Sequence, residues 1–311
     1  MAHHVLGGGR GQLHGSFSRS ARPVLTVASG DTVSFTVPDV SWGLEPPVSV
    51  TLPRKKVEDR ENGPCLCGPV AVDGARPGDT LEVVIERVKP TAWGWTYSGA
   101  GMSRPGLNAR LGIGEAPLTL VRWEVDEAAG VVRGDHGQSA PLRPFPGTIG
   151  LCPDEELAGA WEARACGGNM DCREIVEGAV LLLPVMVAGG LLSVGDGHAA
   201  QGDGEVAGTA VECGLEELRV RVRVRRDVVV KTPRVWAGER WVTIGVGPDL
   251  ESAAVSAMSE MLDVMEGVLG LGRAESLAVA SAQVSLRITQ MVNPAVGVHA
   301  VWKGVSPPSA G

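Results

Sequence analysis

A chain of 311 residues is long enough to bury a sizeable core without disulfide bonds, as one large domain or two smaller ones. Its formal net charge of -8 argues against nucleic acid or an anionic membrane as the main partner, because both require clustered positive charge. The 43 glycines and 21 prolines, with only 4% aromatic residues, predict many turns and short strands rather than a helical bundle.

The six cysteines follow no secretory leader and include no CxxC pair. We therefore expect a cytoplasmic protein with reduced thiols that are buried as small hydrophobic side chains. The longest apolar run, residues 179–187, contains Pro184 and is about half as long as a membrane span. No membrane segment is expected.

The first 22 residues lack periodicity, so we expect mostly an N-terminal arm. His14 lies nearest to the first predicted strand and is either a metal ligand or a solvated side chain. Two alternating segments, residues 24–37 and 70–88, each contain a turn pattern, Ser29-Gly30-Asp31 or Pro77-Gly78-Asp79. Each pattern predicts a hairpin. Residues 93–118, by contrast, are predicted to form a loop.

The C-terminal third changes from strand to helix spacing. Residues 215–230 alternate valine and arginine, so they predict a long strand whose arginines either meet acidic neighbours or bind an anion. Asp249 is a plausible N-cap for a helix that ends near Gly270, and a second helix and a strand follow. The predicted fold is mainly β, sandwich-like or barrel-like, with a smaller α+β segment near the C-terminus: an arm (1–22), a β-rich core that carries the site (23–226) and an α+β segment (227–311).

Residues 165–213 concentrate the polar groups that could carry chemistry. In an extended backbone Asp196 and His198 point to the same side, and so do Asp203 and Glu205. With Asp171 in a glycine-rich turn, they supply enough imidazole and carboxylate groups for a divalent metal ion. The structural alternative is that the carboxylates cap turns and the histidine is simply hydrogen-bonded. The apolar flanks favour the metal, because buried carboxylates without a cation are costly.

The motifs GGNMD and GDGHAAQGDGE, with the upstream GPVAVDGARPGDTLEVVI and PFPGTIGLCP, resemble the acetamidase/formamidase family from about residue 23 to residue 301. The resemblance implies hydrolysis of short aliphatic amides to a carboxylate and ammonia, on a β-rich barrel or sandwich, usually in an oligomer. The expected partners are therefore a small neutral amide and further copies of the chain, as a homodimer or higher homo-oligomer.

Of two histidines that the resemblance implies, this chain matches one and lacks the other. The histidine that precedes the first strand of the family matches His14. Many members also carry His-x-x-Thr before the upstream Gly-Pro, whereas this chain has Cys65-Leu66-Cys67 there. That difference leaves open whether a thiol takes the place of the second histidine.

An amide hydrolase must polarise a carbonyl group and activate water, and a divalent metal ion can do both. Our hypothesis makes Asp171 and His198 metal ligands, with Asp196 and His14 as further ones. Zinc is the first choice of metal, with calcium and magnesium as alternatives.

The remaining polar groups receive catalytic roles in this hypothesis. Glu205 acts as the general base, Asp203 is a further catalytic carboxylate, and Asn169 or the backbone N–H groups of Gly167 and Gly168 donate to the oxyanion. The apolar residues 185–192 would limit the pocket to small substrates. Two rivals remain open: an amidase with a cysteine nucleophile, Cys166 or Cys172, and a non-enzymatic β module that binds a metal or a small amide.

Overall fold

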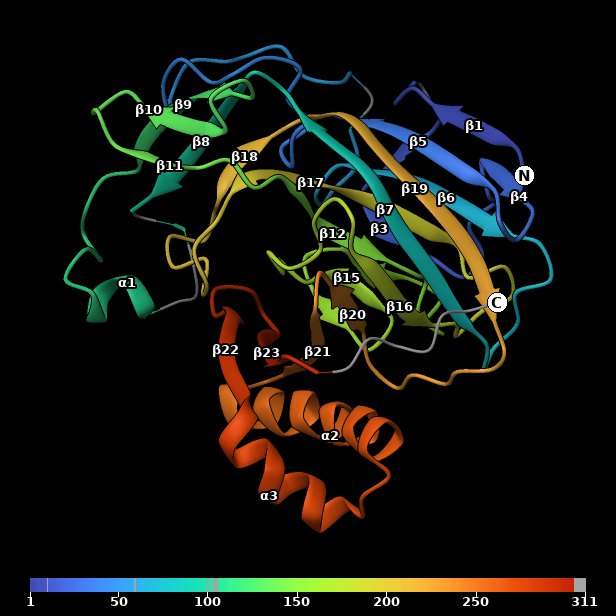
Figure 1. The fold of residues 1–311 in the computed structure, drawn as a ribbon. Coiled ribbons are helices and arrows are strands. Elements are labelled where there is room, and N and C mark those ends of the chain that lie inside the picture. The colour runs from blue at the N-terminus through green and yellow to red at the C-terminus, as the bar shows by residue number, and fades with distance from the viewer. Residues whose placement is uncertain (10, 59, 100, 103–105, 305–311) are drawn as a thin grey trace.

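Two large β-sheets and a helical pair make up the protein (Figure 1), which we describe from a computed structural model. The structure describes residues 1–9, 11–58, 60–99, 101–102 and 106–304. Residues 306–311, which the sequence predicts to be a C-terminal tail, lie outside them. The nine-stranded sheet has the order β1 (His3–Leu6), β5 (Thr32–Val37), β19 (Leu215–Arg225), β7 (Thr80–Pro90), β16 (Val180–Pro184), β20 (Arg234–Ala237), β21 (Arg240–Gly247), β23 (Val296–Trp302) and β22 (Val284–Gln290).

The second sheet has twelve strands and carries the residues of the candidate site. Its main path is β11 (Ser139–Pro141), β10 (Val131–Gly134), β9 (Thr119–Asp126), β8 (Trp93–Ser98), β18 (Val211–Cys213), β17 (Leu192–Ala200), β12 (Phe145–Gly150), β15 (Gly167–Asn169) and β14 (Ala163–Arg164). Strand β6 (Leu66–Val72) branches from β17 and also pairs with β2 (Leu13–His14) and β4 (Leu25–Val27). The smaller elements are the pair β3 (Ser16–Phe17) and β13 (Ala158–Gly159) and the short helix α1 (Leu107–Arg110).

The main hydrophobic core lies between the two sheets. Buried side chains of β5, β7, β16 and β19 from one sheet form a single cluster with those of β6, β12 and β17 from the other. Strand β19 illustrates how the sequence pattern produces this core: Val220 and Val222 point into the cluster, while the arginines between them point away. The predicted fold class, mainly β with a smaller α+β segment, is confirmed.

The arginines of β19 meet acidic partners on the neighbouring strand β7. Arg219 and Arg221 both approach Glu86, the latter at 3.1 Å, and Arg225 pairs with Glu82. This confirms acidic neighbours, rather than a bound anion, as the explanation of the alternating pattern.

Both predicted hairpins are wrong, although both turns exist. Gly30 and Gly78 adopt the positive φ values, 101° and 93°, that tight turns require. However, the strands on either side of each turn belong to different sheets. Before the turns, β4 and β6 lie in the twelve-stranded sheet, where they pair with each other; after the turns, β5 and β7 lie in the nine-stranded sheet. Each turn therefore carries the chain from one sheet to the other, because a turn pattern fixes the reversal of the chain and not the pairing partner.

Two segments expected to be irregular form strands. Residues 93–98 are strand β8, which pairs with β9, and the first 17 residues contribute β1, β2 and β3. The nine-stranded sheet also continues across residue 226, since β20–β23 extend the sheet that β19 and β7 belong to.

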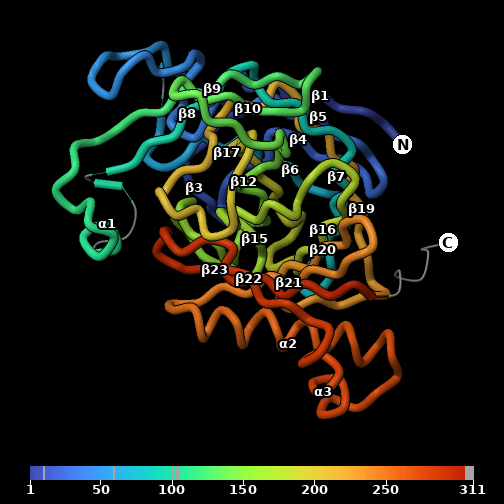
Figure 2. The backbone as a smooth tube through the Cα atoms, turned by 60° about the vertical axis from the view of Figure 1, so that its left-hand side comes forward, coloured from blue at the N-terminus to red at the C-terminus, as the bar shows by residue number. Residues whose placement is uncertain are grey.

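The C-terminal helices match the prediction. Helix α2 (Leu250–Leu269) begins after Asp249, whose side chain accepts a hydrogen bond from the backbone N–H of Ser252, and ends at Gly270 with φ 67°. Helix α3 (Arg273–Gln283) follows and leads into β22. Figure 2 shows α2 along the β21–β23 end of the sheet, with which it shares a second core. Among the helices that the structure describes, none is long and apolar enough to cross a bilayer.

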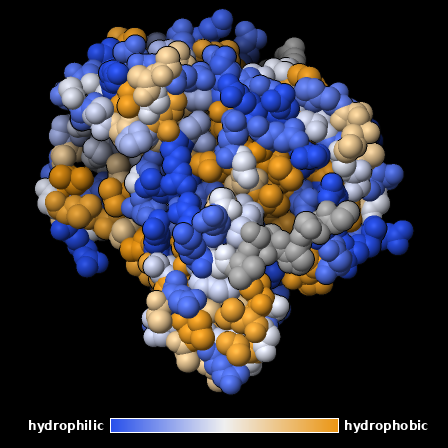
Figure 3. All heavy atoms as spheres, viewed as in Figure 1, coloured by the Kyte–Doolittle hydropathy of each residue, from blue (hydrophilic) through white to orange (hydrophobic). Residues whose placement is uncertain are grey.

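The helical end also carries exposed apolar side chains. In Figure 3 orange atoms are prominent at the narrow lower end, where Figure 1 places α2 and α3. The exposed apolar residues include Val255 of α2, Leu277 of α3, Leu271 between the two helices, and Leu286 and Ile288 of the edge strand β22.

Candidate metal and catalytic site

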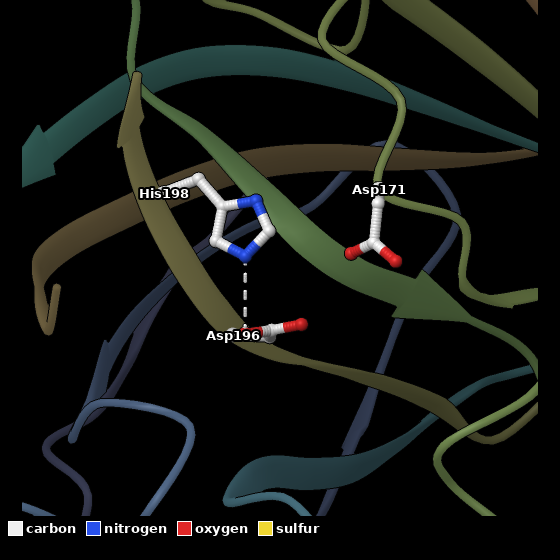
Figure 4. A group of neighbouring side chains, drawn as sticks. All are labelled: Asp171, Asp196 and His198. Carbon is white, nitrogen blue, oxygen red and sulfur yellow. Dashed lines mark hydrogen bonds and ion pairs between the residues drawn. The ribbon is translucent and has the colours of Figure 1, made fainter. Parts of the chain in front are cut away.

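Strand β17 carries the first two residues of the site. It is buried along its whole length between β12 and β18, so its polar side chains face other protein groups rather than solvent. Asp196 and His198 point to the same side, as their spacing predicts, and Nε2 of His198 lies 3.2 Å from Oδ1 of Asp196 (Figure 4).

Asp171 reaches the same place from the segment after β15. Its φ of 50° is unusual for a non-glycine residue and turns the backbone out of the strand. Figure 4 shows its carboxylate next to the His198 ring. Nδ2 of Asn293 donates a 2.7 Å hydrogen bond to Oδ2 of Asp171, and the backbone N–H of Asp171 donates to the carbonyl of Gly147.

Gln201 determines which nitrogen of His198 faces the carboxylates. Its Nε2 donates to the carbonyl oxygen of Asp171 at 2.8 Å, which leaves its Oε1 as an acceptor, 2.9 Å from Nδ1 of His198. Nδ1 must therefore carry a proton. When the imidazole is neutral, its lone pair lies on Nε2 and points toward carboxylate oxygens, and a proton or a metal ion between them would stabilise this arrangement.

Two glutamates complete the group. Glu212 of β18 is the cross-strand neighbour of His198, and its Oε2 lies 3.3 Å from Nε2 of His198. Its other oxygen accepts a 2.8 Å hydrogen bond from the backbone N–H of Ala210. Glu205, with φ 47°, approaches from the loop after β17. All four carboxylates of the cluster and the imidazole are buried.

The geometry forms two overlapping sets of possible metal ligands that share His198. One set is Asp171, Asp196 and His198, and the other is His198, Glu205 and Glu212; within each set the ligand atoms lie within 4.8 Å of one another. One imidazole and several carboxylates is a donor set that suits a divalent cation.

Three buried oxygens in this cluster have no hydrogen-bond donor among the described residues: Oδ1 of Asp171, Oε2 of Glu205 and Oε2 of Glu212. Such oxygens are rare in folded proteins unless an ion or water satisfies them. Gly147 leaves the space between the ligands open, because a Cβ there would lie 2.7 Å from Cε1 of His198 and 2.9 Å from oxygens of Asp171 and Asp196. The residues present therefore fit a metal ion.

The protonation of the cluster reflects burial and crowding of like charges. Burial, and then the charge of Asp196, raise the pKa of Asp171 to about 8. Burial and the charge of Asp171 raise the pKa of Glu205 well above its ordinary value, and burial raises the pKa of Glu212 to about 7.

The other two groups of the cluster shift toward their charged forms. Burial acts against this, but attraction to Glu212 and Asp196 raises the pKa of His198 well above 6.5. Burial likewise opposes ionisation of Asp196, yet the charge of His198 and hydrogen bonds lower its pKa.

His14 lies apart from the two ligand sets. Its Nδ1 is 2.7 Å from the carbonyl of Ser16, and its Nε2 is 3.0 Å from Oγ of Ser193, three residues before Asp196. Burial lowers its pKa despite the bond to Ser16. Its role as a metal ligand stays a prediction.

The structure also separates Asp203 and Asn169 from the ligand sets. Residues 201–210 do not continue β17, and Gly204 has φ 99°, so Asp203 and Glu205 diverge: Asp203 lies 3.9 Å from Arg287, while Glu205 turns inward. Oδ1 of Asn169 accepts a 2.6 Å hydrogen bond from Thr148, and its Nδ2 lies 3.5 Å from the carbonyl of Trp161. The catalytic roles of Asp203 and Asn169 also stay predictions.

The six cysteines are free and buried, as expected. Burial raises the pKa of Cys166 and of Cys172 to about 12, so neither thiol is a ready nucleophile at neutral pH. Cys65 and Cys67 belong to the main core, and burial raises the pKa of both thiols.

A cavity of about 420 Å³ opens next to the cluster. Glu205, Gln201 and Asp203 line it, and so do Arg143 and Arg173. The residues 185–192, expected to wall the pocket, lie elsewhere: Val185 and Leu192 are in the main core, and Leu191 lies beside His14.

Four important residues received no role from the sequence: Gly147, Gln201, Glu212 and Asn293. Gln201 lies within GDGHAAQGDGE, only three residues after His198, so its proximity could have been noticed. Glu212 required knowledge that β17 pairs with β18, and Asn293 required knowledge that the connection between β22 and β23 returns to Asp171.

The comparison with protein-family models decides the family. The model described as the Acetamidase/Formamidase family matches residues 23–166 and 163–296. This chain belongs to the acetamidase/formamidase family. An acetamidase from Mycolicibacterium smegmatis is 29% identical over 234 residues, 56% of each chain, and a formamidase from Methylophilus methylotrophus is 28% identical over 218 residues, 53% of each. The aligned part thus spans about half the length of these curated acetamidase/formamidase relatives.

A solved structure extends the likeness to nearly the whole chain. A predicted acetamidase/formamidase from Thermoanaerobacter tengcongensis superposes with a TM-score of 0.85 at 26% identity, covering 97% of this chain and 96% of that one. The fold described above is therefore the fold of the acetamidase/formamidase family.

Proposed function

We propose that this chain hydrolyses the C–N bond of short aliphatic amides, of the formamide or acetamide type, to a carboxylate and ammonia. The observation that carries the proposal is the buried cluster around His198, with three carboxylate oxygens that lack donors. The relatives named acetamidase and formamidase support the choice of an amide as substrate.

Asp171, Asp196 and His198 would hold the metal ion, with Glu212 and Glu205 close enough to join them. When bound, the ion supplies Lewis acidity, which polarises a carbonyl and lowers the pKa of water. Zinc is our first choice because imidazole is a ligand that suits zinc, whereas calcium and magnesium favour sites made only of oxygen.

The protein groups around the ion would position the substrate and move protons. Glu205 lines the cavity, so its carboxylate could accept a proton from water and return it to the leaving ammonia. Gln201 keeps Nε2 of His198 directed at the ligand cluster. The backbone N–H groups of Gly167 and Gly168, or Asn169, remain our candidates for oxyanion donors.

The deciding experiment measures ammonia release from formamide and acetamide by the purified protein, with and without a chelator. We expect activity that a chelator abolishes and zinc restores. His198→Ala should lose both bound metal and activity, while His136→Ala should lose neither, because the side chain of His136 is 70% exposed and only approaches Asp135 at 3.8 Å. A fully active, metal-loaded His198→Ala variant would contradict the proposal.

The same assay separates the two rival functions. A cysteine-nucleophile amidase would resist chelation and be inhibited by thiol alkylation, but the raised thiol pKa values disfavour it. A non-enzymatic binding module would bind metal or amide and release no ammonia from any short amide.

We also propose that the protein forms a homodimer or a higher homo-oligomer. The exposed apolar side chains on α2, α3 and β22 support this proposal, since apolar surface of this kind is often covered by another chain. Analytical ultracentrifugation tests it: a monomer at micromolar concentration would contradict it.

A further inference from the structure

The cavity next to Glu205 is larger than a formamide or acetamide molecule requires. Its volume of about 420 Å³ lies within the range of about 300 to 1,000 Å³ that is typical of pockets for larger small-molecule ligands. A substrate that fills it must extend well beyond the amide group.

Two guanidinium groups line the cavity together with the carboxylates of Glu205 and Asp203. Arg143 and Arg173 line it, and Arg143 shares the buried carboxylate of Glu174 with Arg240 and Arg287, at 2.8, 2.9 and 3.5 Å. Asp203 lies 3.9 Å from Arg287. Three guanidinium groups thus share two carboxylates, and Arg173 adds a fourth positive charge beside the cavity.

Arg173 is a lining arginine whose hydrogen-bonding capacity is not fully used. Its Nε atom is buried and has no hydrogen-bond acceptor among the residues that the structure describes. A guanidinium nitrogen without an acceptor is unfavourable, and an anionic group bound at Arg173 would offset this cost.

The cavity also has an apolar lining. Trp123, Val206 and Val211 belong to it, so the cavity offers a surface along which a hydrocarbon chain can lie.

We propose that the cavity is a subsite for the acyl chain of amides that carry a carboxylate, or another anion, remote from the bond that is cleaved. This inference rests on the proposed amide hydrolysis and specifies its substrate class. The amide group lies at Glu205, the chain contacts the apolar lining, and the anion binds Arg173 and Arg143. Water adds to the acyl carbon, the C–N bond breaks, and ammonia leaves with the proton from water.

The test compares initial rates on succinamate, the monoamide of a four-carbon dicarboxylate, with those on succinamide, its neutral diamide of nearly the same shape. We expect kcat/KM for succinamate to exceed that for succinamide by at least about tenfold, the factor that one charge-assisted hydrogen bond provides. Arg173→Met should reduce this ratio to about one, and Arg173→Lys should retain part of it.

Because the ratio is measured within each variant, a general loss of activity cancels. Arg133→Met is the matched control, since Arg133 lies on β10 and pairs with Asp126 at 3.4 Å, and its ratio should equal that of the wild type. A wild-type ratio near one, or a ratio that Arg173→Met leaves unchanged, would overturn the subsite.

Calorimetry with both compounds distinguishes failure of the subsite from failure of the enzymatic proposal. If no amide is hydrolysed, the proposed function fails. Succinamate that still binds more tightly than succinamide, and loses this advantage in Arg173→Met, then supports the anionic subsite. Equal affinities, or binding of neither compound, would reject it.

Discussion

Oε1 of Gln201 lies 2.9 Å from Nδ1 of His198, and this contact fixes the proton on the nitrogen that faces away from the carboxylates. Groups that orient a ligating histidine affect metal affinity without touching the metal. Replacing Gln201 by Ala should therefore weaken zinc binding by about 10 to 100-fold, as measured by competition with a chromogenic chelator. Gln138→Ala, between β10 and β11, is the control. Unchanged affinity in Gln201→Ala would show that the amide has no orienting role.

Gly147 tests the space between the ligands. An added Cβ would lie 2.7 Å from Cε1 of His198 and 2.9 Å from oxygens of Asp171 and Asp196, closer than side-chain atoms tolerate. Gly147→Ala should reduce amide hydrolysis by at least about 100-fold, because small displacements of catalytic groups have effects of this size. Gly159→Ala adds a Cβ with nothing within 4 Å and should behave as the wild type. Equal activity of both variants would show that the space is not used.

The buried thiols test the covalent alternative. With pKa values of about 12, Cys166 and Cys172 are protonated at neutral pH. Cys166→Ala and Cys172→Ala should both retain ammonia release, and brief alkylation of the folded protein should not inhibit it. If Cys172→Ala were inactive with its metal content unchanged, a cysteine nucleophile would replace the metal mechanism.

His299 makes stability depend on pH. Burial lowers its pKa from 6.5 to about 4. Between these values the unfolded chain binds a proton that the folded protein does not. The stability that the protein has with a neutral, buried His299 is therefore fully present above pH 6.5. The free energy of unfolding falls by about 3 kcal/mol as the pH decreases from 6.5 to 4.

The corresponding variant is His299→Gln, which cannot titrate in this range. Urea unfolding at pH 7 and pH 5, with chelator present, should show a smaller loss of stability on acidification in His299→Gln than in the wild type. The same loss in both proteins would mean that other groups account for the pH dependence.

Local spacing predicted the part of the site that lies on one strand. Asp196 and His198 are two residues apart on β17 and converge, although Asp196 has a positive φ of 56° within the strand. The same rule failed for Asp203 and Glu205, because positive φ values at Gly204 and Glu205 turn that segment away from a strand. Periodicity cannot reveal such backbone changes.

Strand pairing was the larger gap. Alternation located β5, β7 and β19 and helical spacing located α2, but nothing in residues 24–37 indicated that β4 and β5 would enter different sheets. Glu212 was missed for the same reason, since it meets His198 only through the pairing of β17 with β18. These pairings are decided by burial of the strands in a common core, and the composition of this core depends on the whole chain.

The hydrogen bond from Asn293 to Asp171 joins residues that are 122 positions apart in the chain. During synthesis on the ribosome, Asp171, Asp196 and His198 emerge long before Asn293 does. The amide that holds the Asp171 carboxylate is therefore missing while both sheets are still being completed. The set of hydrogen bonds around Asp171 is therefore complete only after the C-terminal part of the chain has been made.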